Sequence, residues 1–188
     1  MTGRSSIPLQ ASALLRASIA CAALLAAPLV SQAQAPHEHG VVHLDVAVDA
    51  KRITIQMSSP LDNLIGFERA PRTEAERQRV AAMVASLRAS SRLFAIDPAA
   101  ACKPGAVELS SAALQLGKPD PAELQAGHAD IDASFEFDCT DAGRAGFIDT
   151  TLFGAFASMQ RIAAQIASNR GQRQLTLTRP ASRIALPR

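Results

Sequence analysis

A chain of 188 residues, with 48% hydrophobic and 19% charged side chains, is long enough for one domain with a substantial core. Its net charge of +2 at pH 7 equals the contribution of Arg4 and Arg16, which lie in an N-terminal segment without acids. The rest of the chain is therefore neutral and has no basic run. This argues against nucleic acid or an anionic membrane surface as a partner.

The N-terminal segment has the three parts of a secretory signal peptide. Two arginines precede an almost wholly apolar run over residues 17–30, and the small residues of 31–35 follow it. The apolar run is too short for a membrane span, so we expect none once the signal is removed.

We expect the signal peptide to be cleaved after Ala33. Cleavage after Ala35 would leave Pro36 at the first position of the mature chain. The predicted organisation is a signal peptide over 1–33 and a single periplasmic domain over 34–188. Its location would be the periplasm.

Three of the four histidines in the chain, His37, His39 and His43, follow the predicted cleavage site. Imidazole is the commonest protein ligand for zinc and copper, so this crowding predicts a metal site. The alternation that follows indicates a strand, on which side chains two positions apart share a face. All three histidines would then lie on the polar side, with a bend at Gly40. The alternative is that they are exposed and share no metal.

Two alternating segments, 42–48 and 53–58, predict a hairpin of antiparallel strands with a tight turn at 49–51. Pro60 should end the second strand because it has no N–H to offer the sheet. The apolar side chains of 61–67 come next. We expect this loop to cover one end of the sheet, and a docking surface for another protein is the alternative.

The main helix is expected over about residues 74–90. Thr73 and Glu76 have the spacing of a capping box, and apolar residues follow at helical intervals. Alternation predicts further strands, and 152–156 should form a short helix or turn. The strands are expected at 107–116 with a bulge, 129–139, 161–166, 174–178 and 183–186. The fold class is therefore α+β: a single domain of antiparallel strands with one main helix packed against them.

Two cysteines, Cys102 and Cys139, remain after the signal is removed. An isolated pair in an exported protein predicts a disulfide bond, with Cys139 on the buried side of its strand. Two thiolate ligands for zinc are the alternative. That arrangement is less expected, because zinc thiolates usually come in close pairs along the chain.

The fourth histidine, His128, opens the strand 129–139 on its polar face, with Asp130 beside it. A fourth ligand from this strand would complete a tetrahedral zinc site. Asp130 would then be a further ligand or would accept a hydrogen bond from one.

No enzyme motif accompanies the histidines. The helical metalloprotease pattern H-E-x-x-H is absent, and no serine occupies a G-x-S-x-G turn. No thiol stays free as a nucleophile if the cysteines are bridged. Asp45, Asp62 and Glu68 could form an acid–base set, but nothing in the sequence links them. We expect no catalytic activity.

Several short motifs follow one another at close range. They are HEHG at 37–40, LDVA at 44–47, SPLDNLIGFE at 59–68, APR at 70–72, and GHAD leading into FEFDC within 127–139. In this series the chain resembles ZrgA, a family of small exported proteins named for zinc regulation. The similarity covers nearly the whole predicted mature chain, and the stretch from SPLDNLIGFE to APR is its most specific part.

The resemblance implies a periplasmic zinc-binding protein that assists an ABC-type zinc importer. Carried over to this sequence, the family ligands would be His37, His39 and His128. Two departures stand out: Arg69 lies where the family often has histidine, and residues 117–127 lack the histidines that many members carry there. Arg69 cannot bind a cation and would repel one nearby, so both departures predict a reduced metal capacity.

The predicted function is a non-catalytic zinc-binding accessory protein that supports zinc uptake or homeostasis. Its ligands for Zn²⁺ would be His37, His39, His43 and His128, with Asp130 beside them. Two alternatives stay open. One is an interaction module of the cell envelope that binds no metal. The other is a copper carrier, since imidazole sites usually bind Cu²⁺ more tightly than Zn²⁺.

Overall fold

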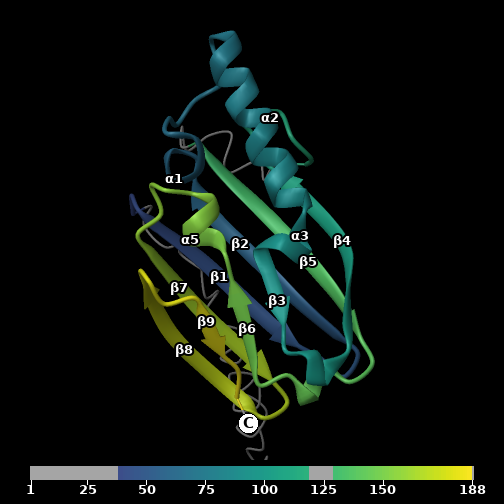
Figure 1. The fold of residues 1–188 in the computed structure, drawn as a ribbon. Helices are drawn as coiled ribbons and strands as arrows, with labels where there is room; N and C mark the ends of the chain where they lie inside the picture. Colours follow the sequence, from purple (N-terminus) through teal and green to yellow (C-terminus); the bar gives the residue numbers. More distant parts are fainter. Residues whose placement is uncertain (1–37, 119–128, 188) are drawn as a thin grey trace, which may run out of the picture. The chain divides into compact units, whose positions relative to one another are not determined.

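The computed structural model describes residues 38–118 and 129–187 (Figure 1). Two of the predicted ligands, His37 and His128, lie outside these ranges, as does the predicted signal peptide. Among the described residues, no helix is both long and apolar enough to cross a membrane.

A six-stranded sheet forms the larger part of the fold, with the strand order β4-β5-β2-β1-β7-β8. Its strands are β1 (Val41–Val48), β2 (Arg52–Pro60), β4 (Cys102–Ser110), β5 (Asp130–Cys139), β7 (Arg161–Ser168) and β8 (Gly171–Thr178). The predicted hairpin is confirmed, because β1 and β2 pair antiparallel from His43–Ser58 to Val48–Ile53. Pro60 ends β2, as expected.

One pairing in this sheet was not expected. β1 runs parallel to β7, with Val41 opposite Arg161 and Val48 opposite Ser168. The sheet is therefore mixed, whereas the sequence predicted antiparallel strands alone. A parallel pair needs a long crossover connection, and here all of the chain between β1 and β7 serves as one.

A second, three-stranded sheet has the order β3-β6-β9. It consists of β3 (Phe94–Ile96), β6 (Phe147–Thr150) and β9 (Arg183–Ala185), all paired antiparallel. The sequence predicted β9 but missed β3 and β6. Figure 1 shows this sheet in front of the large one, and the rings of Phe94 and Phe135 meet with their centroids 5.1 Å apart.

Several helices take the place of the single main helix that the sequence predicted. The longest is α2 (Glu74–Arg88), and its capping box between Thr73 and Glu76 is confirmed. It stops short of the expected end at residue 90, and a separate turn, α3, follows it. The other elements are α1 (Asp62–Ile65), α3 (Ser90–Leu93), α5 (Leu152–Ala155), and the 3₁₀ turns η1 (Pro98–Ala100) and η2 (Ala142–Arg144).

The core lies between the inner face of the large sheet and the elements that cover it. Alternate residues of β1, β2, β5 and β7 are buried there, including Leu44, Ile55 and Phe135. On the opposite face the same strands carry polar, mostly exposed side chains. This alternation is what a sheet with one solvated face requires.

The edge strand β4 is joined to β5 by a disulfide bond between Cys102 and Cys139, as predicted. Cys139 is buried, as expected from the phase of its strand. The predicted bulge is also present, but it lies between Pro104 and Val107. The segment 114–116 is no strand, because Leu116 forms only an isolated bridge back to Ser111.

Candidate metal centre

Three side chains with metal-binding atoms converge at one end of the large sheet. His39 lies just before β1, Asp62 is the first residue of α1, and Glu68 follows that helix. One ligand atom from each lies within 4.8 Å of the others. His39 Nδ1 is hydrogen-bonded to Asp62 Oδ2 and lies 3.6 Å from Glu68 Oε1.

A buried asparagine holds the segment with His39 against α1. Asn63 Oδ1 accepts a hydrogen bond from the Gly40 N–H at 2.6 Å, and Asn63 Nδ2 donates to the Val41 carbonyl at 2.8 Å. Gly40 has φ +80°, a left-handed conformation that glycine adopts without strain. Its carbonyl accepts the N–H groups of Gln160 and Arg161. Gly40, the residue after His39, is therefore hydrogen-bonded to α1 through its N–H and to the start of β7 through its carbonyl.

The loop over 61–67 is anchored by burial, which sets the position of both acids. Leu61 and Ile65 belong to the core, and Leu64 and Phe67 pack against it. The loop thus covers the end of the sheet, as expected. Leu64 and Phe67 are only partly buried, so the docking surface that was the alternative stays untested.

The three side chains influence one another electrostatically. The pKa of His39 is raised, first by its hydrogen bond to Asp62 and then by the charges of Asp62 and Glu68. The pKa of Glu68 is raised chiefly by burial, and the negative charges of Asp62 and Asp130 add to this effect. Among the described residues, Asp62 Oδ1 is buried and accepts no hydrogen bond. Two close carboxylates, one of which has a buried oxygen without a partner, suit a cation.

Arg69, which was expected to repel a cation at this site, is bound elsewhere. Its guanidinium pairs with both carboxylate oxygens of Glu76, at 3.0 and 2.7 Å. It also donates to the Ala70 carbonyl and lies 5.0 Å from the centre of the Phe67 ring. The hydrogen bond from Arg69 and that from the Arg72 N–H lower the pKa of Glu76 to about 2, so this pair stays charged at any physiological pH.

The other predicted ligands have different positions. His43 lies on β1 opposite Ser58 and Ala163, on the polar face of the sheet, and is not part of the group around His39. Asp130 begins β5 opposite Pro60, and its charge acts on Glu68. The structure thus places Asp130 where its charge acts on Glu68 and leaves His43 on the sheet, and the roles of Asp130 and His43 in metal binding stay predictions.

Sequence reasoning did not assign Asp62 and Glu68 as ligands. Both lie in the SPLDNLIGFE stretch that carried the family resemblance, and this was the signal available. The two acids are 23 and 29 positions from His39 in the chain. Only folding shows that these two acids lie beside His39. Asp45, the third acid considered, lies instead on the exposed face of β1.

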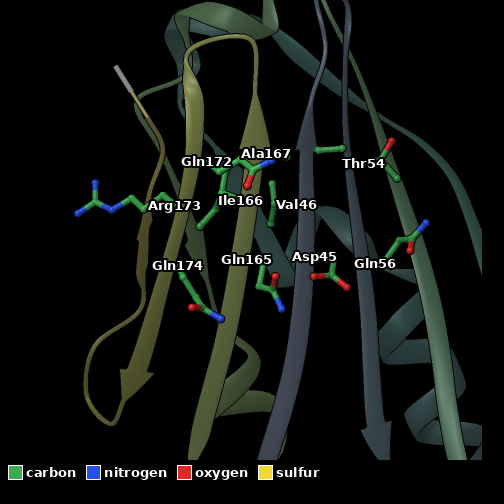
Figure 2. A pocket seen from close by; sticks show the side chains of 11 residues that line it. Asp45, Val46, Thr54, Gln56, Gln165, Ile166, Ala167, Gln172, Arg173 and Gln174 are labelled. Carbon is green, nitrogen blue, oxygen red and sulfur yellow. The ribbon is translucent and has the colours of Figure 1, made fainter. Parts of the chain in front are cut away.

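A separate groove of about 580 Å³ lies on the exposed face of the large sheet. Figure 2 shows its polar side chains, of which Gln174, Gln165, Asp45 and Gln56 form one row across four neighbouring strands. Asp45 is the one acid among the lining residues, and no histidine lines the groove. It therefore lacks the convergent donors that zinc requires.

The fold and the acid–histidine group describe a small domain with a candidate cation site at one end of a mixed sheet. The family model of the ZrgA family zinc uptake proteins matches residues 36–186, and the chain belongs to this family. No curated protein sequence matches the chain.

Proposed function

We propose that this protein is a periplasmic zinc-binding accessory of zinc uptake. It would hold Zn²⁺ at His39, Asp62 and Glu68, with His37 and His128 as further ligands, and would support an ABC-type importer. The observation that carries the proposal is the convergence of one imidazole and two carboxylates, one of which, Asp62, has a buried oxygen without a hydrogen-bond partner.

The donor set fits zinc, and so does the spacing of His39 and Glu68, whereas His39 and Asp62 are hydrogen-bonded to each other and would have to move apart around an ion. Nitrogen and oxygen ligands bind Zn²⁺ at about 2.0–2.2 Å, which places neighbouring ligands of a tetrahedron about 3.3–3.6 Å apart. His39 Nδ1 and Glu68 Oε1 are 3.6 Å apart. A zinc ion bound there would replace the proton that His39 shares with Asp62 and would satisfy Asp62 Oδ1.

Two further observations support the location and the role. A disulfide bond between Cys102 and Cys139 is typical of an exported protein. The family description as a zinc uptake protein favours a carrier over an enzyme.

Calorimetric titration of the mature protein with zinc tests the site. Loss of a residue that only orients a ligand typically weakens metal affinity by at least about tenfold, and loss of a ligand itself should weaken it further. His39→Ala, Asp62→Asn and Glu68→Gln should therefore each weaken zinc binding by more than about tenfold. Asp45→Asn, which removes an exposed acid from the sheet, is the matched control and should bind as the wild type does.

Binding by all three variants at the wild-type affinity would refute the site, and absence of heat from the wild type would refute zinc binding. His43→Ala tests the remaining candidate, because a loss equal to that of His39→Ala would make His43 a ligand. The same titration with Cu²⁺ separates a zinc carrier from a copper carrier. Zinc-limited growth of a deletion strain, complemented with wild type or His39→Ala, tests the role in uptake.

A further inference from the structure

We propose that Glu76 is a positioning residue of the metal centre. It holds the Arg69 guanidinium against the start of α2 and thereby keeps this cation away from the group His39, Asp62 and Glu68. The inference rests on the proposed zinc site. It explains how an arginine directly beside a ligand in the sequence is compatible with binding a cation.

The contacts of Arg69 leave its guanidinium little freedom. Two of its nitrogens bind the two oxygens of Glu76, and one of them also donates to the Ala70 carbonyl. Paired parallel bonds between guanidinium and carboxylate fix geometry as well as adding energy. The Phe67 ring, 5.0 Å from the guanidinium carbon, adds a cation–π contact.

Glu76 is itself fixed, so it can act as an anchor. Its side chain accepts the N–H groups of Arg72 and Thr73 and is only 11% exposed. Thr73 in turn accepts the Glu76 N–H, which completes the capping box of α2. The cap of the helix and the restraint on Arg69 therefore depend on the same carboxylate.

Loss of this anchor would free Arg69 beside an acidic group. Glu68 is its neighbour in the chain, and among the described residues no ion pair joins the two. A freed guanidinium would pair with Glu68 or Asp62 and would compete with the metal for their oxygens. A unit charge about 6 Å from a divalent ion in water lowers the affinity by about one power of ten.

Four variants separate this role from a general effect on the fold. Glu76→Gln removes the charge that holds Arg69 but keeps an oxygen that can accept the capping N–H groups. Arg69→Gln removes the competing cation, and the double variant removes both. Glu74→Gln is the matched control, because it deletes another acid from the first turn of α2, one that pairs with the exposed Arg77.

Zinc affinity by calorimetry is the readout, with thermal unfolding of each apo variant measured alongside. Glu76→Gln should bind zinc about tenfold more weakly than the wild type. Arg69→Gln and Glu74→Gln should bind as the wild type does, and the double variant should regain wild-type affinity although its cap is as altered as in Glu76→Gln.

Wild-type affinity in Glu76→Gln would overturn the proposal, and so would a double variant that stays weak, since that would show a structural effect of the altered cap. Failure of the wild type to bind zinc would instead overturn the proposed function.

Discussion

Replacing Asn63 by alanine should both destabilise the domain and weaken the metal centre. Asn63 is 2% exposed and joins two segments that are 23 positions apart in the chain. It accepts from the Gly40 N–H at 2.6 Å and donates to the Val41 carbonyl at 2.8 Å. Both backbone groups would lose this partner in the variant, and so would the Ser59 hydroxyl, which accepts from Asn63 Nδ2 at 3.3 Å.

The magnitude follows from the cost of unsatisfied buried groups. Each buried donor or acceptor left without a partner costs about 1–3 kcal/mol, so the loss of both should lower the free energy of unfolding by about 2–6 kcal/mol. Asn63→Asp keeps the acceptor for Gly40 but buries a carboxylate oxygen against the Val41 carbonyl, and should therefore destabilise the domain at least as much. Asn169→Ala, in the exposed turn between β7 and β8, is the control and should change little.

Urea denaturation under non-reducing conditions measures the change in stability. Zinc titration under native conditions measures the change in metal affinity. His39 directly precedes Gly40, so a freed segment should also weaken zinc binding. An unfolding midpoint of Asn63→Ala equal to that of the control would refute the assigned role of the two hydrogen bonds. Lower stability with unchanged zinc affinity would show that Asn63 does not position His39.

Two further predictions concern the disulfide and pH. Replacing both Cys102 and Cys139 by serine should lower the free energy of unfolding by about 2–4 kcal/mol in denaturation experiments, and an unchanged midpoint would contradict this. Zinc affinity should fall with decreasing pH, because the metal needs neutral His39, whose raised pKa keeps it protonated to a pH above 6.5. The loss of zinc affinity should begin above that pH and deepen as Glu68, whose pKa is also raised, takes up its proton. Constant zinc affinity between about pH 7.5 and 5.5 would contradict the assignment of His39 and Glu68 as ligands.

Much of the secondary structure could be predicted because its signals are local. The alternation over 42–48 and 53–58 and the short turn between them determine which residues pair and which face is buried. The capping box of Thr73 and Glu76 likewise determines where α2 begins. The pairing of Cys102 with Cys139 followed from their isolation in a chain expected to be exported. The signal peptide stays a prediction.

The tertiary structure decided which distant segments meet. Alternation assigns the faces of a strand but not its neighbours, because backbone hydrogen bonding is nearly independent of sequence. The parallel pairing of β1 with β7 was therefore not visible in either segment. The same holds for the candidate site: His39, Asp62 and Glu68 lie in separate stretches, and burial of Leu61 and Ile65 brings them together. Histidine content indicated a metal, whereas only the fold identified the carboxylates that would bind it, because their convergence depends on long-range packing.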